Sequence, residues 1–345
     1  MKKITFLLFF PFYCFAQIPA YYGSVDFTQT GENLKTQLAA LITTTHTYEL
    51  EYTPEVWNAL KQTDLDPANP ENVLLIYGYN DADAIGSNDR TRDKDLSCHV
   101  SGCTGFWVRE HTFAQSLGEP DLETEGAGSD AHHLRAIDSQ MNGSRSNKPF
   151  ADGSGTATTI TGGLWYPGDE WKGDVARMMM YMYIRYQSQC EAVDVGSGST
   201  SYSPLGDMPN IFLEWNQEDP VSQYEMNRNT ILQGIQGNRN PFIDNPYLAT
   251  LIWNGPQAQD TWGLLAEEDY AINKVMVYPT VTTGVIFIEN PDATTYNYTL
   301  HNSVGQQIAF SVADNKIDLG SNASGIYFLS LSSGSDSRVI RIVKQ

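Results

Sequence analysis

Two short stretches of the chain carry residue types from which phosphodiester chemistry can be built. The stretch "WVREHTFAQS" contains Glu110 and His111, and "DAHHLRAIDSQMNGSRSN", which begins at residue 130, contains Asn142 and Arg145. A histidine can take a proton from water near neutral pH, and a hard divalent cation held by oxygen ligands can neutralise a phosphate. Together the two stretches predict one site that holds a metal ion and a phosphate.

The local geometry of the first stretch decides whether Glu110 and His111 can act together. Along an extended strand, neighbouring side chains point to opposite faces, which would separate the carboxylate from the imidazole. The residues that follow, "TFAQS", show no alternation of apolar and polar side chains. We therefore expect the strand to end or bend at this pair.

The second stretch predicts a short helix. Asp138 or Ser139 is a suitable N-cap residue for a helix through "SQMNGSRSN". Asn142 and Arg145 are three residues apart and so share one face of that helix. Asn142 and Glu110 are expected to supply oxygen ligands to the cation, with Arg145 aimed at the phosphate and water completing the coordination shell, as magnesium prefers.

Two other metal sites are alternatives. A zinc ion could be held by His111 with His132 and His133, but no cysteine or carboxylate stands at a suitable spacing to complete that set. The polar stretch "NDADAIGSNDRTRDKD" is similar to a calcium loop at Asp81 and Asp83, yet an isoleucine and an arginine stand where oxygen ligands are required. We interpret it as a solvated loop.

The start of the chain predicts export. The opening "MKKITFLLFFPFYCFA" has the charged and apolar parts of a secretory signal peptide, with Gln17 as the mature start, and no later segment is apolar for long enough to cross a membrane. Acylation of Cys14 is an alternative that the bulky residues before it disfavour. Of the remaining cysteines, Cys98 and Cys103 enclose only "HVSG", so a local disulfide and a pair of free thiols are both open, with Cys190 left over.

The pattern of the chain changes near residue 272. "NLKTQLAALITTT" and "GDVARMMMYMYIRYQ" predict an amphipathic and a buried helix, and "VLLIYGY" a short buried strand. Later, short alternating runs broken by Gly, Asn, Asp and Ser predict a small all-β sandwich of about seven strands. We expect an α+β chain with a signal peptide at 1–16, a mainly helical domain at 17–272 and a β-sandwich at 273–345.

The charge of the larger domain limits its partners. Residues 17–272 hold 14 basic and 36 acidic side chains, a net charge of −22. Such a surface opposes broad electrostatic capture of a polyanion, which normally rests on clustered Lys and Arg. Substrate binding would require a local positive strip, for which the candidates are Arg109, Arg135, Arg145 and Lys148.

Four blocks in order, "WVREHTFAQS", "SDAHHLRAIDSQMNGSRSNKPF", "KGDVARMMMYMYIRY" and "QGNRNPFID", resemble the endonuclease I family of secreted nucleases, within the ββα-metal or His-Me finger superfamily. The resemblance covers most of residues 20–260. It implies a strand ending in Glu110 and His111 and a helix bearing Asn142, with His111 as general base, Glu110 and Asn142 as magnesium ligands and Arg145 beside the phosphate. Mn²⁺ or Ca²⁺ could take the place of Mg²⁺.

The resemblance also implies cleavage of DNA, and often RNA, with little sequence preference and 5′-phosphate products. His132 and His133 match a family pair that supports the site from behind. Asn245 and Ala136 depart from the residues common in the family, but neither is an expected ligand.

The last 73 residues are similar to the C-terminal sorting domain of the type IX secretion system, in "VYPTVTTG" and "GIYFLSLSSGSDSRVIRIVK" above all. This implies recognition by that machinery, passage through the periplasm of a Gram-negative cell and release to the outer surface or the medium. An adhesive or carbohydrate-binding sandwich is the alternative for this region. For the whole chain the alternatives are a catalytically silent surface or nucleic-acid-binding protein on the same fold and a phosphodiesterase for small substrates.

Overall fold

The computed structural model describes residues 18–100, 102–265, 275–290, 295–313, 315–333 and 336–345. The chain divides into two compact units, one up to Leu264 and one from Leu265. The predicted signal peptide and the boundary predicted between residues 272 and 273 both lie outside the described residues. Within the described residues, no helix is both long and apolar enough to cross a bilayer.

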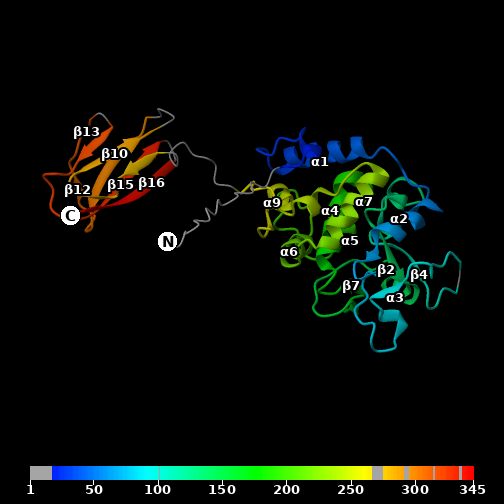
Figure 1. Ribbon diagram of the computed structural model, residues 1–345. Coiled ribbons are helices and arrows are strands. Elements are labelled where there is room, and N and C mark those ends of the chain that lie inside the picture. The colour runs from blue at the N-terminus through cyan, green and yellow to red at the C-terminus, as the bar shows by residue number, and fades with distance from the viewer. Residues whose placement is uncertain (1–17, 101, 266–274, 291–294, 314, 334–335) are drawn as a thin grey trace, which may run out of the picture. The chain divides into compact units, whose positions relative to one another are not determined.

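The first unit is built around one buried helix, α4 (Lys172–Tyr186), which Figure 1 shows in its middle. The predicted buried helix is thus confirmed, and its methionines 178–180 all lie in the core. Helix α1 (Gly31–Thr45) packs against α4 through Leu34, Leu38 and neighbouring apolar residues, which confirms the predicted amphipathic helix. The remaining helices are α2 (Glu55–Thr63), α3 (Ser139–Arg145), α5 (Ala192–Val195), α6 (Asn210–Glu218), α7 (Gln223–Gln236), α8 (Pro241–Asp244) and α9 (Tyr247–Trp253), with 3₁₀ turns η1 (Ala20–Tyr22), η2 (Gly86–Asn88), η3 (Gln115–Leu117), η4 (Gly126–Ser129) and η5 (Gln187–Gln189).

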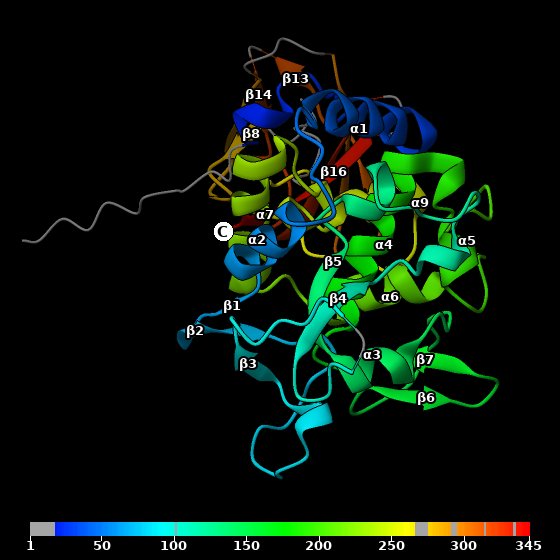
Figure 2. The same cartoon turned by 90° about the vertical axis from the view of Figure 1, so that its right-hand side faces the viewer.

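Small antiparallel sheets flank these helices. Strands β4 (Trp107–His111) and β5 (Leu134–Asp138) pair with each other, and β5 runs directly into α3 (Figure 2). The other strands of this unit are β1 (Leu65–Asp66), β2 (Asn69–Leu74) and β3 (Thr91–Asp93) in one sheet and β6 (Thr158–Ile160) with β7 (Leu164–Tyr166) in another.

The strand predicted over "VLLIYGY" must be corrected. Strand β2 ends at Leu74, and the next residues stay buried without forming a strand. Tyr77 has a left-handed backbone, with φ of 70°, which a regular strand cannot contain. The segment is held instead by the N–H of Ile76, which donates to the carbonyl of Ala136 in β5 at 2.9 Å.

The second unit consists of two sheets with one shared core. The sheet orders are β13-β14-β10-β8 and β12-β11-β15-β16-β9, and apolar residues from both sheets form the core. The prediction of a small β-rich unit is confirmed. Within the described residues it has more strands than the seven predicted, because strands of two or three residues are too short to show alternation. The strands are β8 (Met276–Tyr278), β9 (Val281–Thr282), β10 (Val285–Glu289), β11 (Asn297–Asn302), β12 (Gln307–Ile308), β13 (Val312–Ala313), β14 (Lys316–Asp318), β15 (Gly325–Ser333) and β16 (Asp336–Lys344).

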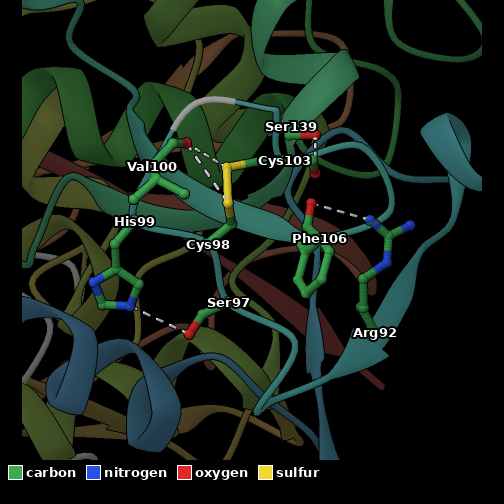
Figure 3. Close-up of a disulfide and its surroundings, with 8 residues drawn as sticks. All are labelled: Arg92, Ser97, Cys98, His99, Val100, Cys103, Phe106 and Ser139. Carbon is green, nitrogen blue, oxygen red and sulfur yellow. Dashed lines mark hydrogen bonds between the residues drawn. A yellow bond between two sulfur atoms is a disulfide. The ribbon is translucent and has the colours of Figure 1, made fainter.

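A disulfide joins Cys98 and Cys103 just before β4 (Figure 3), so of the two open alternatives the bonded pair is present. Cys190 is a buried free thiol. The hydroxyl of Ser139 donates to the carbonyl of Cys103 at 2.6 Å. The disulfide loop therefore precedes β4 in the sequence and is also hydrogen-bonded to the first residue of α3.

Candidate active site

The hairpin of β4 and β5, followed by α3, brings the predicted residues together. Glu110 lies opposite Arg135 in the register of the two strands, and His111 is the last residue of β4, where the strand was expected to end. Glu110, His111 and Asn142 line the same open cavity of about 560 Å³. The other lining residues are Tyr52, Arg109, Ala114, Gln115, Ser116, Ser146 and Asn147.

The start of α3 is fixed by the predicted cap. Oδ1 of Asp138 accepts hydrogen bonds from the backbone N–H groups of Gln140 at 2.7 Å and Met141 at 3.0 Å. Its other oxygen, Oδ2, pairs with the guanidinium of Arg92 at 2.5 Å. These contacts hold the helix that carries Asn142, whose side chain is partly exposed in the cavity wall.

The His111 ring has one defined tautomer. Its Nε2 lies 2.9 Å from the carbonyl oxygen of Gly128, which can only accept, so Nε2 carries the proton and Nδ1 carries the lone pair. Burial, and then the neighbouring His133, lower the pKa of His111 to about 3, so the ring is neutral near pH 7. A Cβ at Gly128 would lie 1.7 Å from the carbonyl oxygen of Glu123, so this position accepts only glycine.

The Glu110 carboxylate is held through one oxygen. The Tyr77 hydroxyl donates to Oε1 at 3.3 Å, and Nε of Arg145 lies 3.2 Å from the same atom. Oε2 has no hydrogen-bond partner among the described residues. Burial raises the pKa of Glu110 to about 7, although Arg145 and Tyr77 oppose that rise.

The position of Arg145 requires a correction. We predicted that it faces the phosphate, but its side chain is fully buried and does not line the cavity. Its Nη1 and Nη2 donate to the carbonyls of Ser146 and Thr112, each at 2.7 Å, while Nε faces Glu110. The guanidinium therefore lies behind the carboxylate, buried away from the cavity in which a phosphate would bind.

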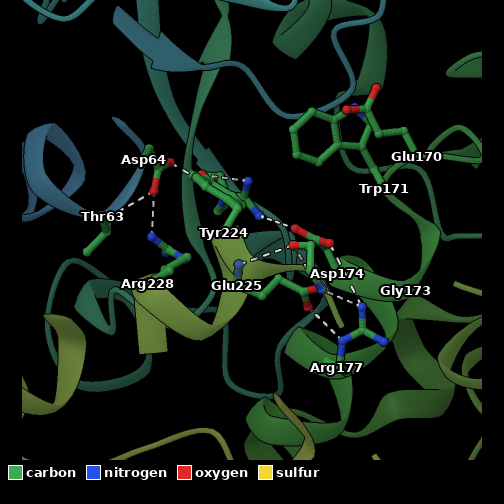
Figure 4. A network of polar contacts seen from close by, with 12 residues as sticks. Thr63, Asp64, Glu170, Trp171, Gly173, Asp174, Arg177, Tyr224, Glu225 and Arg228 are labelled. Carbon is green, nitrogen blue, oxygen red and sulfur yellow. Dashed lines mark hydrogen bonds and ion pairs between the residues drawn. The ribbon is translucent and has the colours of Figure 1, made fainter. Parts of the chain in front are cut away.

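Arg135 must also be removed from the predicted positive strip. Its guanidinium is buried, 3.0 Å from Asp174 and 3.4 Å from Asp64. Figure 4 shows the surrounding network, in which Arg228 pairs with Asp64 and Arg177 with Glu225. These buried ion pairs join α2, β5, α4 and α7, so Arg135 contributes to the framework behind the hairpin.

Of the other predicted cations, only Arg109 is found in the cavity wall formed by described residues. Its guanidinium lies 3.4 Å from the centre of the Tyr52 ring and 4.4 Å from that of Trp57. The Tyr52 ring also stacks on His111, with ring centres 5.4 Å apart. Lys148 is half-buried beyond α3 and its amino group donates to the carbonyl of Ser144.

His132 and His133 lie behind the cavity and do not join His111 in a metal cluster. Nε2 of His133 donates to the carbonyl of Ala127 at 2.8 Å, and Nε2 of His132 lies 3.4 Å from the carbonyl of Asn238. Among the described residues, no three His, Cys, Asp or Glu side chains are grouped to hold a metal ion. The zinc alternative therefore has no support in this geometry.

The calcium-loop alternative also has no support in this geometry. The carboxylate of Asp81 accepts from the backbone N–H groups of Arg90 and Thr91, and that of Asp83 accepts from Asn80 and Asn88. Both acids close the loop by hydrogen bonding, as the interpretation of a polar loop requires.

The donor set at the cavity fits a hard divalent cation. A carboxylate with one unbonded oxygen and an amide side chain are oxygen ligands, and the open cavity leaves room for water ligands, as magnesium prefers. Among the cysteines that the structure describes none competes as a thiolate, because Cys190 is buried elsewhere and Cys98 is bonded to Cys103.

Three positions that line the cavity or contact its residues were missed from the sequence: Tyr52, Tyr77 and Gly128. Tyr52 and Tyr77 lie in irregular segments far from the two motifs, and neither belongs to a periodic pattern. Gly128 lies between the motifs, in "EGAGSD", where a glycine required by close packing looks like an ordinary turn residue. Only the folded chain brings them to the site.

The family model described as Endonuclease I matches residues 30–247, which is more than half of the chain and includes every residue of the cavity. The chain belongs to the endonuclease I family. A second model, described as Secretion system C-terminal sorting domain, matches residues 276–345. This endonuclease I protein is therefore a nuclease that carries a type IX sorting domain and is directed out of the cell or to its surface.

Two curated relatives agree with this assignment. The chain is 40% identical to the extracellular ribonuclease of Bacillus subtilis (strain 168) over 252 residues, which cover 69% of this chain and 80% of the relative. It is 40% identical to the extracellular ribonuclease of Bacillus amyloliquefaciens over 238 residues, which cover 65% of this chain and 75% of the relative.

Proposed function

We propose that this protein is a secreted, divalent-metal-dependent endonuclease that hydrolyses DNA and RNA with little sequence preference and leaves 5′-phosphate ends. The observation that carries the proposal is that Glu110, His111 and Asn142 line one open cavity at the end of β4. RNA is included because both curated relatives are named ribonucleases. The sorting domain supports export through the periplasm of a Gram-negative cell.

In this proposal His111 is the general base. Its Nδ1 lone pair accepts the proton of the attacking water, while Nε2 stays bonded to Gly128 and fixes the plane of the ring. A neutral imidazole is the form that can accept this proton. An anionic phosphate beside the ring favours the protonated imidazolium, which offsets part of the effect of burial during the reaction.

Glu110 and Asn142 would hold the cation, with Mg²⁺ as the expected ion and Mn²⁺ or Ca²⁺ as substitutes. Such an ion supplies charge neutralisation at the phosphate and at the departing oxygen. We propose that β4, β5 and α3 form the ββα-metal finger, since the hairpin carries Glu110 and the helix that follows carries Asn142.

The two arginines have different proposed roles. Arg145 acts through Glu110, which it orients by its contact to Oε1 and whose negative charge it balances. Arg109 lies in the cavity wall and is the residue we assign to contact with a substrate phosphate. A single arginine and a bound cation form a short positive strip, which suits an enzyme that must release its product from an acidic body.

The decisive experiment is digestion of plasmid DNA and of a long RNA by the purified protein with Mg²⁺, with excess chelator, and by the His111→Ala variant. We expect cleavage with Mg²⁺, none with chelator, and a loss of about 10²–10⁴-fold in rate for the variant, the range for removal of a general base. Equal digestion by both proteins would refute the role of His111. Digestion that survives chelation would refute the role of the metal, and no digestion by either protein would favour the silent binding protein.

A further inference from the structure

Tyr77 is a buried residue outside both sequence motifs whose hydroxyl reaches the proposed metal ligand. It lies in the segment that follows β2, and its side chain is fully buried. The ring packs edge-on against Trp165, with centres 5.5 Å apart and an interplanar angle of 65°. The hydroxyl donates to Oε1 of Glu110 at 3.3 Å.

The backbone at Tyr77 has a conformation that a tyrosine rarely adopts. Its φ of 70° lies in the left-handed region, where a bulky side chain is disfavoured. The surroundings hold it there: the N–H of Ile76 donates to Ala136 of β5, and the indole N–H of Trp171 donates to the carbonyl of Gly78 at 3.0 Å. A Cβ at Gly78 would lie 2.1 Å from the carbonyl oxygen of Asp89, so the chain cannot shift in that direction.

The strained turn and Arg145 act on the same atom. Oε1 of Glu110 accepts a hydrogen bond from the Tyr77 hydroxyl and lies 3.2 Å from Nε of Arg145. Tyr77 precedes Glu110 in the sequence and Arg145 follows it, and the two are 68 positions apart. One hydrogen bond and one ion pair on the same oxygen restrict rotation of the carboxylate about its final bond. The second oxygen, Oε2, is then left with a fixed direction and no hydrogen bond from a described residue.

We propose that Tyr77 is a positioning residue that orients the Glu110 carboxylate for cation binding, a role that rests on the proposed function of Glu110 as a metal ligand. Tyr77 contacts neither the cation nor the substrate. Hydrogen bonds that orient a ligand in this way commonly change metal affinity 10–100-fold when they are removed. Such a role gives a reason for a left-handed tyrosine, since strained backbone is retained where the fold uses it.

The test is a Tyr77→Phe substitution in the full chain, which keeps the ring and removes only the donor. We expect the dissociation constant for Mn²⁺, measured by isothermal titration without substrate, to rise at least about 10-fold. We expect the Mg²⁺ concentration for half-maximal cleavage to rise by a similar factor. At saturating Mg²⁺ the cleavage rate should approach that of the unaltered protein, with unchanged KM for nucleic acid.

The chain offers a matched control in Tyr22→Phe. The buried hydroxyl of Tyr22 donates to Oδ2 of Asp244 at 2.5 Å, and that oxygen also pairs with Nε of Arg239 at 2.6 Å. The control thus removes a tyrosine from a carboxylate that an arginine also holds, at a place outside the cavity. It should lower the thermal unfolding temperature without changing Mn²⁺ affinity.

A Glu110→Gln variant separates failure of this inference from failure of the proposed function. If Glu110→Gln abolishes Mn²⁺ binding and Tyr77→Phe leaves it unchanged, Glu110 is a ligand and the role of Tyr77 is refuted. If Glu110→Gln itself leaves binding unchanged, the metal assignment fails. A Tyr77→Phe protein that loses thermal stability as the Tyr22→Phe protein does, with no change in Mn²⁺ affinity, would reduce Tyr77 to a structural role.

Discussion

Glu110 and His111, adjacent in the sequence, lie in different surroundings because they project from opposite faces of β4. Arg109 and His111 share one face, where the Tyr52 ring contacts both side chains. Glu110 projects to the other face, toward Tyr77 and Arg145. The carboxylate and the imidazole are therefore oriented by different neighbours. Both still line one cavity, because β4 ends at His111.

Arg109 is the residue at which the substrate contact can be measured. Replacing Arg109 with Gln removes the one positive side chain in the cavity wall formed by described residues. We expect weaker binding of nucleic acid and a plot of log affinity against log salt concentration whose slope falls by about one, as for loss of one phosphate contact. Binding by a chelator-treated His111→Ala protein, followed by fluorescence anisotropy, avoids cleavage during the measurement.

Arg90→Gln is the control, because Arg90 is partly exposed, pairs with Glu170 and lies outside the cavity. A salt slope that changes equally in both variants would assign the effect to total charge and remove Arg109 from the substrate site.

The residue types of the site could be predicted from the sequence, but the directions of the side chains could not. Glu110, His111 and Asn142 stand in motifs whose spacing predicts convergence, and they do line one cavity. Arg135 and Arg145 look equally available in the sequence, yet both are buried. Their burial depends on acids from distant segments, Asp64 and Asp174 for Arg135, and no local pattern indicates such pairs.

At the scale of elements, the N-terminal end of α3 is held by contacts from several segments. Asp138 caps the helix and pairs with Arg92. Figure 3 shows the other two contacts, in which Ser139 bonds to the disulfide loop and Arg92 donates to the carbonyl of Phe106. The cap and the helix were predictable, because a capping residue precedes a short run with a clear end. The contacts of Ser139 with Cys103 and of Asp138 with Arg92 were not, because they join residues that are 36 and 46 positions apart in the sequence.

Asp138 separates the contribution of the cap from that of the ion pair. Asp138→Asn keeps an oxygen that can accept from the first turn of α3, but loses the charge that faces Arg92. Asp138→Ala loses both. We expect urea unfolding to show that both variants are destabilised, with Asp138→Ala less stable than Asp138→Asn by about 1 kcal/mol, the usual value of a cap. Equal stability of the two variants would mean that the cap contributes nothing.

At the scale of the molecule, the two units have separate hydrophobic cores and different charge. The change in pattern after residue 272 predicted two cores, because the two kinds of periodicity, helical and alternating, need different packing. The predicted strand over "VLLIYGY" was wrong beyond Leu74 for a related reason. A buried apolar run predicts burial but does not reveal a left-handed turn such as that at Tyr77.

Buried histidines give the first unit a defined response to acid. Burial lowers the pKa of His133 to about 4, against the attraction of Asp130 and with a smaller lowering from Arg228. Below pH 6.5, the ordinary pKa of histidine, His133 binds a proton in the unfolded chain but not in the folded chain. His133 therefore lowers the free energy of unfolding as the pH falls from about 6.5 to 4. Glu110 and Asp174 act in the opposite sense, because burial raises the pKa of each carboxyl.

The contribution of His133 is isolated by His133→Gln, which can still donate to Ala127. We expect the free energy of unfolding of the variant, relative to the unaltered protein, to rise as the pH falls from 6.5 to 4, by at most roughly 3 kcal/mol. Urea unfolding at a series of pH values gives this difference. A difference that stays constant over that range would show that His133 is protonated in the folded chain.

The turn η4 contacts the rings of both His111 and His133, which are 22 positions apart in the sequence. Consecutive carbonyls, those of Ala127 and Gly128, accept the N–H groups of His133 and His111. A backbone change in this turn must therefore displace both imidazoles together. In laboratory evolution of the enzyme, a substitution at one of these two histidines would then be accompanied by a compensating substitution at the other. Gly128 would not be replaced in any variant that stays active.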